Sequence, residues 1–320
     1  MGENNLLKKV IKSVIKYSFN RKFRFSFNSV KTHMYDKVSD EKFLKRKYKI
    51  FLNKKLNLEN PETYTEKLQW LKLYDRRSEY TIMVDKCTAK SYVASKIGEE
   101  YIIPTIGIWD SPDEIDFDQL PEKFVIKCNH NSGLGMYICC DKNKMDISKV
   151  RRNLKKGLAQ NYYLTGREWP YKNVKRCIIA EKYMEDSTYK ELRDYKFFTF
   201  NGIPKVLYIT QGRGTNSETV ADFYDMEFNH LPFTIDHEMS KIPPKKPECF
   251  EDMKRLAAIL SEGTPQLRVD FYEVDGKVYF GEMTFFHCSG FENFHPEEWD
   301  KIFGEWIILP TERNEEKTCF

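Results

Sequence analysis

The chain of 320 residues lacks the glycine-rich motifs of the two most common nucleotide-binding folds. Neither the P-loop pattern G-x-x-x-x-G-K-[ST] nor the dinucleotide fingerprint G-x-G-x-x-G occurs in it. Its eight cysteines include no C-x-x-C pair. Because Cys128, Cys139, Cys140 and Cys177 fall within or beside apolar, strand-like runs, we expect them to be small buried residues in a reducing compartment.

Long apolar runs are absent as well. No segment reaches the roughly 18 apolar residues of a membrane span, and the N-terminus lacks the apolar stretch of a secretory signal, so a cytoplasmic location is expected. The net charge of +4 is mild, and no basic stripe or nucleic-acid motif is present, which argues against a nucleic-acid partner. With 41% hydrophobic and 15% aromatic residues, the chain can bury a large core, and its length suggests about two domains.

The N-terminal residues carry an amphipathic pattern, with apolar side chains at helical spacing on one face and basic side chains on the other. The apolar positions are Leu6, Leu7, Val10, Ile11, Val14, Ile15 and Tyr17 to Phe19, and the basic ones are Lys8, Lys9, Lys12, Lys16, Arg21, Lys22 and Arg24. Such a helix either lies in an anionic membrane surface or packs on the protein body or a second subunit. The first alternative predicts peripheral contact through residues 5–24 at the inner face of the membrane.

Residues 268–290 indicate two strands that bear carboxylates. Residues 268–274 and 277–286 are rich in β-branched and aromatic types and are joined by an Asp-Gly hairpin signal. Asp270 and Glu282 lie inside these strands, and two carboxylates among apolar neighbours suggest an oxygen-ligand Mg²⁺ site. Strict pairing sets Asp270 opposite Gly281, so Glu282 shares its face only if a bulge or a longer loop intervenes. The alternative is a hairpin whose acids face water.

A strand, a glycine loop and a second strand occupy residues 124–140. Lys127 ends the first strand, and Ser132 and Gly133 lie in the loop, so a cation and backbone N–H groups can surround phosphate oxygens. An ordinary hairpin is the alternative. Farther along, the strand from Ile178 runs into a connector, Glu181, Lys182, Tyr183 and Met184, that can offer main-chain groups and apolar walls to an adenine.

Asp194 and Lys196 lie two residues apart, and so on one face of an expected strand. They suit a ribose hydroxyl and a phosphate, or they form a surface ion pair. Helices are expected at residues 41–55, 65–73, 89–97, 147–163 and 251–261, and strands dominate residues 177–210. The sequence therefore predicts an α+β protein.

Taken together, the motifs resemble the ATP-grasp superfamily of carboxylate–amine ligases, and within it the TupA-like polysaccharide-biosynthesis family. The resemblance runs from about residue 58 to residue 310, and its most distinctive segments are residues 60–75, 84–86, 107–110, 127–133, 194–196 and 290–299. It implies an ATP-grasp fold with a small mobile lid subdomain and a larger C-terminal mixed or antiparallel sheet. The parts implied are a basic N-terminal extension (1–45), an N-terminal portion of the fold (46–118), the lid (119–179) and a C-terminal subdomain for ATP, Mg²⁺ and substrate (180–320).

The resemblance also implies roles for residues that match the family pattern. Lys86 and Lys127 stand where ATP-grasp ligases hold the ATP phosphates, with Ser132 and Gly133 in the adjoining loop; Glu181 to Met184 resemble the adenine connector, with Asp194 on the ribose and Lys196 near the phosphates. Asp270 and Glu282 resemble the Mg²⁺ ligands. Thr284 stands where the family has a third ligand, asparagine, which leaves the second metal ion open, with water or a neighbour such as Asn293 in its place.

Arg268 resembles the arginine that steadies the acyl-phosphate and the tetrahedral intermediate, and Arg213 is either a second such arginine or a solvated turn residue. His130 and His287 are either substrate contacts or ordinary hydrogen-bonded loop residues. The reaction implied is amide formation between a carboxylate, carried by a glycan precursor or an amino acid, and an amine. Two lysines, an arginine and Mg²⁺ would neutralise the charge that develops. The competing functions are a glycosyltransferase, for which Asp116 and Asp118 form the only Asp-x-Asp motif, and a nucleotide-binding module without ligase activity.

Overall fold

The computed structural model describes residues 17–187, 192–212, 219–235 and 237–312. Its α-helices are α2 (Arg21–Val30), α3 (Asp40–Phe51), α4 (Tyr64–Tyr74), α5 (Glu79–Val84), α6 (Thr88–Ile97), α7 (Ile147–Ala159), α8 (Tyr163–Gly166), α9 (Phe250–Leu260) and α10 (Glu298–Trp306). Short 3-10 helices are η1 (Glu99–Tyr101), η2 (Pro112–Glu114), η3 (Phe117–Gln119), η4 (Lys142–Lys144), η5 (Trp169–Tyr171) and η6 (His287–Gly290).

The strands form three sheets in which every pairing is antiparallel. They are β1 (Thr105–Trp109), β2 (Phe124–Cys128), β3 (Met136–Cys139), β4 (Ile178–Lys182), β5 (Asp194–Phe200), β6 (Ile203–Gln211), β7 (Val220–Tyr224), β8 (Thr234–Ile235), β9 (Gln266–Val274), β10 (Lys277–Thr284) and β11 (Phe294–His295). Their orders are β1-β4-β2-β3, β10-β9-β5-β6-β7 and β11-β8. The α+β class expected from the sequence is confirmed, and the large C-terminal sheet is antiparallel.

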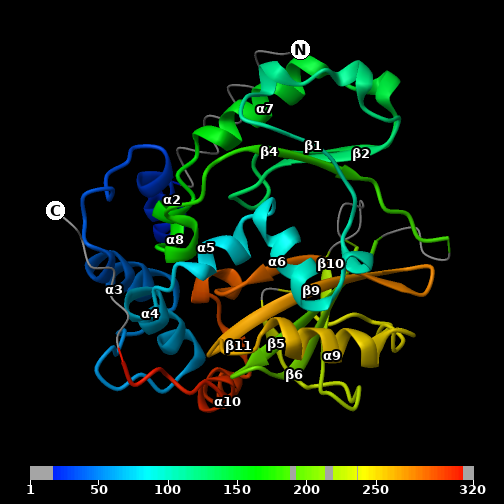
Figure 1. The fold of residues 1–320 in the computed structure, drawn as a ribbon. Helices are drawn as coiled ribbons and strands as arrows, with labels where there is room; N and C mark the ends of the chain where they lie inside the picture. The colour runs from blue at the N-terminus through cyan, green and yellow to red at the C-terminus, as the bar shows by residue number, and fades with distance from the viewer. Residues whose placement is uncertain (1–16, 188–191, 213–218, 236, 313–320) are drawn as a thin grey trace.

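The four-stranded sheet has a hydrophobic core of its own, formed with α7. Its strands come from residues 105–182. This range starts before the lid expected at residues 119–179 because β1 pairs with β4, and it ends later because β4 continues to Lys182. The glycine loop lies directly on α7: a Cβ added to Gly157 would be 2.7 Å from the Cα of Gly135. In Figure 1 this layer lies at the top of the molecule, and the five-stranded sheet with α9 lies at the bottom.

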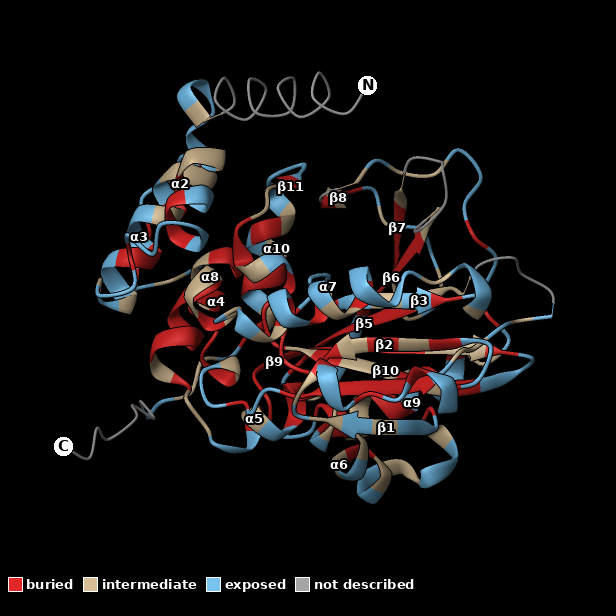
Figure 2. Ribbon diagram, turned by 90° about the horizontal axis from the view of Figure 1, so that it is seen from above, coloured by how far each residue is buried: buried red, intermediate tan, exposed pale blue. Residues whose placement is uncertain are grey.

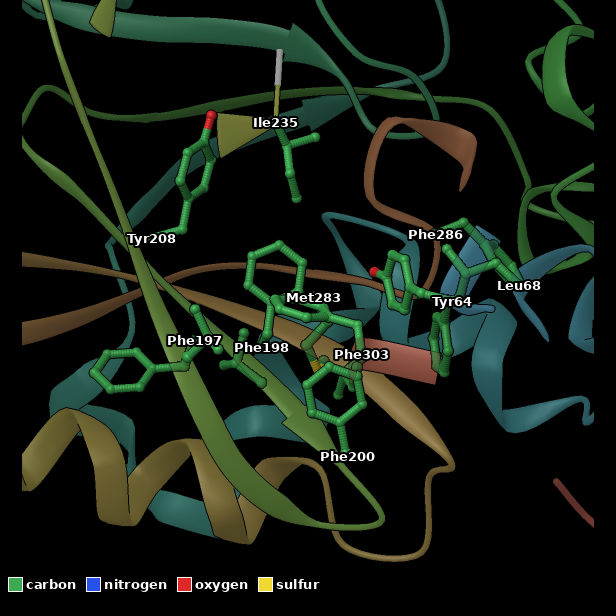
Figure 3. Close-up of a cluster of buried hydrophobic side chains, with 14 of the residues drawn as sticks. Tyr64, Leu68, Phe197, Phe198, Phe200, Tyr208, Ile235, Met283, Phe286 and Phe303 are labelled. Carbon is green, nitrogen blue, oxygen red and sulfur yellow. The ribbon is translucent and has the colours of Figure 1, made fainter. Parts of the chain in front are cut away.

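The five-stranded sheet is covered on both faces. On one face, Phe197 of β5 contacts Phe250 of α9, with ring centroids 5.9 Å apart. The next residue, Phe198, points the opposite way and contacts Phe303 of α10 at 5.8 Å. Figure 3 shows Phe198 and Phe303 with Tyr64 of α4 in the same cluster. The aromatic cluster therefore fills part of the face from which the charged residues described below also project.

Helix α4 joins the N-terminal part of the chain to the sheet. A capping box of Thr63 and Glu66 starts it, and Asp300 of α10 accepts hydrogen bonds from the backbone N–H and the hydroxyl of Thr65 at 2.9 and 2.8 Å. Gly304 allows the close approach, since a Cβ there would meet the backbone before Tyr64. Figure 2 shows that α4, β5 and β9 are largely buried. This contact fixes α4 above the C-terminal elements.

The expected amphipathic helix lies mostly in residues 1–16, outside the described residues. Tyr17 to Phe19 are helical, and α2 then begins at Arg21 after the N-cap residue Asn20, whose side chain accepts a hydrogen bond from the backbone N–H of Phe23. Within the described ranges, no helix is long and apolar enough to cross a membrane. Among the cysteines, Cys128, Cys139 and Cys177 are buried, but Cys140 is exposed, so the expectation of burial was wrong there. It follows Cys139 at the end of β3, where alternation turns its side chain outward.

Candidate functional site

Three charged residues form a row across neighbouring strands of the large sheet. Lys196 of β5 is paired with Asp270 of β9, which is paired with Glu282 of β10. The register between β9 and β10 shifts between Phe280 and Glu282, so that Gly281 has no partner of its own. This β-bulge turns Glu282 to the face of Asp270, as the metal-site hypothesis requires. An extra Cβ on Gly281 would lie 3.0 Å from the Asp270 carbonyl oxygen, so glycine suits the tight backbone there.

Arg268 lies at the centre of a hydrogen-bond network on this face. Its Nε and Nη2 donate to the two carboxylate oxygens of Asp270 at 2.7 Å each, and Nη2 also donates to Glu282 Oε1 and Thr284 Oγ1 at 3.1 Å. Nη1 lies 2.7 Å from Nδ1 of His287. Because an arginine only donates, Nδ1 is the unprotonated nitrogen of that ring. These contacts hold the guanidinium in one orientation beside the carboxylates.

Burial and neighbouring charge set the ionisation of the row. Burial raises the pKa of Asp270 to about 6 in spite of the attraction of Arg268 and Lys196. Burial likewise lowers the pKa of Lys196, whose Nζ lies 2.8 Å from Asp194 Oδ2. Burial acts to raise the pKa of Glu282 too, but attraction to Lys86 and Arg268 outweighs it, so that this pKa is below its ordinary value. Lys196 and Asp270 are thus poorly solvated and depend on neighbouring charges or on a bound ion, whereas the side chain of Glu282 is partly exposed.

A second group of charges comes from the four-stranded sheet and α6. Lys127 of β2 and Lys90 of α6 form ion pairs with the two carboxylate oxygens of Glu181, at 2.5 and 2.6 Å. The β2–β4 pairing sets Glu181 next to Lys127 on the same sheet. Burial acts to raise the pKa of Glu181, yet the two lysines outweigh it and lower that pKa. The structure therefore places Glu181 as the counterion of a predicted phosphate-binding lysine.

Lys86 is held where the glycine loop meets the segment before α6. Its Nζ donates to the carbonyl of Asn131 at 2.9 Å, and burial lowers its pKa. Asn129, which is fully buried, connects the parts: its side chain donates to Asp85 at 2.7 Å and accepts from the backbone of Cys177 at 2.8 Å. This network fixes Lys86 relative to β2 and β4.

A cavity of about 350 Å³ lies beside the charged row of the large sheet and is bordered by Lys86 as well. Its lining residues are Lys86, Asn131, Ser132, Tyr162, Thr165, Glu168, Tyr171, Lys196, Tyr208, Thr210, His237, Arg268, Glu282, Thr284, Phe286, His287, Cys288 and Ser289. A narrower cavity beside it is lined by Lys86, Lys90, Lys127, Glu181 and Glu282 together with apolar residues of α5, α6 and β10. The two cavities share Lys86 and Glu282, so one predicted phosphate-binding residue and one predicted metal ligand border both, whereas Asp270 lines neither.

The sequence matches the family model of the TupA-like ATP-grasp proteins over residues 66–308. The chain belongs to the TupA-like ATP-grasp family. No curated protein matches it. Among solved structures it is similar to D-alanine–D-alanine ligase from Bacillus anthracis complexed with ATP, at 17% identity and a TM-score of 0.37, over 63% of this chain and 53% of that one. The D-alanine–D-alanine ligase from Helicobacter pylori is similar at 13% identity and a TM-score of 0.42, over 77% of this chain and 69% of that one.

The chain thus spans little more than half of the Bacillus anthracis ligase. The match to the family model confirms the ATP-grasp fold that the motifs indicated.

The donor set of the ATP-grasp site suits a single Mg²⁺ ion. Asp270 and Glu282 supply carboxylate oxygens side by side, and each Asp270 oxygen keeps a lone pair beyond its bond to Arg268. In residues 17–187, 192–212, 219–235 and 237–312, no group of three or more His, Cys, Asp or Glu is arranged to hold a metal ion. Mg²⁺ commonly takes one or two carboxylates and completes its shell with phosphate oxygens and water, so the residues present fit the ion.

Several predicted site residues do not line these cavities. Gly133 has a positive φ of 79° and faces open space, Lys182 is the exposed last residue of β4, and Tyr183 and Met184 follow it. Asp194 and Asp270 also line neither cavity. Arg213 lies outside the described residues. The adenine role of the connector and the catalytic role of Arg213 stay predictions.

Lys90 and Glu168 were not predicted from the sequence, whereas His287 and His130 were each left with two alternatives, a substrate contact or an ordinary hydrogen-bonded loop residue. Lys90 lies four residues after Lys86, but Lys86 is in the turn before α6, so this spacing gives only a weak signal among 52 basic residues. His287 lines the cavity and contacts Arg268, and burial lowers its pKa well below the ordinary value. His130 instead is a buried loop residue with Nε2 3.0 Å from the Gln160 carbonyl oxygen. Glu168 had no motif around it at all.

Proposed function

We propose that the protein is an ATP-dependent carboxylate–amine ligase that forms an amide through an acyl-phosphate. The acyl substrate we propose is a uronate or an amino-acid carboxylate in surface polysaccharide biosynthesis, of the capsule or teichuronopeptide kind. The observation that supports this best is the alignment of Lys196, Asp270 and Glu282 beside Arg268. Of these residues, Lys196, Glu282 and Arg268 line the cavity that Lys86 also borders. A site that only stores a nucleotide has no need of a fully engaged arginine next to the carboxylates.

The residues divide into two sets that act on different parts of the substrates. Lys86 and Lys127 would bind the ATP phosphates, with Lys127 exchanging Glu181 for a phosphate oxygen, and Asp194 would bind the ribose. Asp270 and Glu282 would hold Mg²⁺, which as a Lewis acid neutralises phosphate charge. Arg268 would bind the acyl-phosphate oxygens, since its guanidinium is already oriented by four side chains and reorganises little.

Hydroxylamine trapping tests this function. Incubation with ATP, Mg²⁺, hydroxylamine and a panel of uronates and acidic amino acids is expected to yield a hydroxamate together with ADP, both followed by mass. Asp116 and Asp118, the Asp-x-Asp candidate, are exposed around η3, and Asp116 accepts a hydrogen bond from the backbone of Asp118. A protein that makes neither hydroxamate nor ADP, yet transfers from a sugar nucleotide, would be a glycosyltransferase instead.

A further inference from the structure

One carboxylate of the large cavity comes from neither sheet. Glu168 lies between α8 and η5, is 4% exposed, and lines the cavity together with Tyr162 and Tyr171. The other acidic lining residue is Glu282, which belongs to the proposed metal pair. The function proposed above leaves Glu168 without a role, and the fold holds it at considerable cost, because a buried carboxylate is poorly solvated.

The surroundings of Glu168 hold its carboxylate in place from behind. Its side chain is hydrogen-bonded to Ser289, and the Ser289 hydroxyl accepts a hydrogen bond from Lys72 Nζ at 2.9 Å. Lys72 is fully buried and does not line the cavity. Burial raises the pKa of Glu168, and the attraction of Lys72 acts against that rise. The buried Lys72 therefore partly neutralises the charge of Glu168 from behind, while Glu168 itself lines the cavity.

Two tyrosines stand beside this carboxylate. The rings of Tyr162 and Tyr171 meet edge to face with centroids 4.8 Å apart, and both residues line the cavity. The negative charge of Glu168 is the first cause, and burial the second, of a raised pKa at Tyr162, so its hydroxyl stays protonated. Aromatic rings and a carboxylate together attract an ammonium group.

The rest of the lining disfavours an ammonium group. Lys86, Lys196 and Arg268 are cations that suit phosphate and carboxylate oxygens, and Glu282 is already drawn to Lys86 and Arg268. A protonated amine entering the cavity therefore meets attraction chiefly at Glu168. We propose that Glu168, with Tyr162 and Tyr171, is the subsite for the amine substrate, which binds as a primary ammonium ion. This inference rests on the ligase function proposed above.

The chemistry at this subsite balances without a further reactant. The ammonium gives one proton to the Glu168 carboxylate, and the freed nitrogen lone pair attacks the acyl carbon. A C–N bond forms, the C–O bond to phosphate breaks, and phosphate leaves with the bonding electrons. The second nitrogen proton goes to the departing phosphate, so the products are an amide and inorganic phosphate. Glu168 would thus both bind the amine and accept its proton.

The test compares two nucleophiles that differ in charge. Near pH 7 hydroxylamine is mostly uncharged, whereas methylamine, ethanolamine, glucosamine and amino acids carry an ammonium group. Steady-state rates of ADP formation are measured for the wild type and for Glu168→Gln, with hydroxylamine and with the best of these amines. Since hydrogen bonds between charged groups discriminate by roughly 10- to 100-fold, the variant should raise the amine KM by that factor. For hydroxylamine, the change in KM caused by Glu168→Gln should be at least tenfold smaller than the change for the amine.

Two further variants keep the outcome decisive if Glu168→Gln folds poorly. Glu168→Asp keeps the charge but shortens the side chain, and should give an amine KM between those of the wild type and Glu168→Gln. Tyr171→Phe keeps the ring and should change the amine KM far less than either. Equal losses for both nucleophiles in the Glu168 variants, or an unchanged amine KM, would overturn the proposal.

Calorimetric titration with ethanolamine separates the subsite from the reaction. Wild-type protein should bind it, and Glu168→Gln should lose that binding whether or not turnover is detected. A wild type that binds ethanolamine through Glu168 but forms neither hydroxamate nor ADP would refute the ligase function and retain the amine subsite. Equal ethanolamine binding by both proteins would refute the subsite alone.

Discussion

Replacement of Lys72 by methionine probes the turn that carries Ser289 and, through it, Glu168. Lys72 Nζ donates to Gln69 Oε1, the Gly166 carbonyl, and both the carbonyl and the hydroxyl of Ser289, at 2.8–3.0 Å. Three successive residues of that turn, Cys288, Ser289 and Gly290, have positive φ values of 47, 55 and 63°. Such a backbone persists only where its surroundings hold it, and Lys72 is one of the groups that do so.

The size of the effect follows from the groups that lose a donor. A buried acceptor without a partner costs about 1–3 kcal/mol, and an ammonium can serve three at once. Burial already lowers the pKa of Lys72 well below its ordinary value, so removing the charge returns part of the cost of burying it. The expected net loss is about 3–5 kcal/mol, the range for removing one partner of a buried ionic group. Methionine is chosen because it fills a similar volume.

Urea unfolding followed by circular dichroism measures this loss. Lys67→Met is the matched control, since Lys67 lies on the same helix, is only partly buried, and donates to two backbone carbonyls instead of four acceptors. It should cost about 1 kcal/mol or less, the net contribution of an ordinary hydrogen bond. The Lys72 variant should also raise the amine KM. A stability loss equal to that of Lys67→Met, or an increase in stability, would refute the reasoning.

Three other predictions address the metal pair and the N-terminus. Asp270→Asn or Glu282→Gln should reduce turnover by at least about 100-fold with an unchanged circular dichroism spectrum; ATP consumption near the wild-type rate would mean that the site is wrongly placed. Because burial raises the pKa of Asp270 to about 6, its contribution to stability is present below its ordinary pKa and lost as pH rises through about 6. Between pH 5 and 8 the free energy of unfolding of the wild type should therefore fall relative to that of Asp270→Asn as pH rises. A difference in free energy of unfolding that does not change with pH would contradict this. Deleting residues 1–19, which keeps the Asn20 cap of α2, should release the protein from anionic vesicles in a salt-dependent manner; equal co-sedimentation of both forms would remove the membrane role.

The carboxylate pair shows how far the sequence alone can lead. The residue types and the Asp-Gly turn predicted the hairpin, and β9 and β10 match it closely. The sequence did not decide the register of the two strands. It only indicated that Glu282 shares the face of Asp270 if a bulge or a longer loop intervenes, because a bulge depends on contacts that the local pattern does not contain. Gly281, which is the bulged residue, is the one local signal in retrospect.

Charge pairs between distant segments were beyond the reach of the motifs. Glu181 was assigned to an adenine connector, yet it lies between Lys127 and Lys90, and this contact arises from the pairing of β2 with β4 and the docking of α6. Glu168 reaches the cavity through α8 and η5, which are too short to have a periodic signal. Both cases need the topology before the partner can be named.

The departure at Thr284 takes on a physical meaning in this setting. The family pattern has asparagine there as a third ligand, but here the Thr284 hydroxyl accepts a hydrogen bond from Arg268 at 3.1 Å, and the backbone pairs Thr284 with Arg268 across β9 and β10. A threonine oxygen engaged in this way helps to orient the guanidinium. In the proposed mechanism the pair Asp270 and Glu282 would then remain for the metal, and Arg268 would carry more of the countercharge on the transferred phosphoryl group. Thr284→Asn should therefore loosen Arg268 rather than improve catalysis, and a higher turnover at saturating Mg²⁺ in that variant would show that the site lacks a ligand instead.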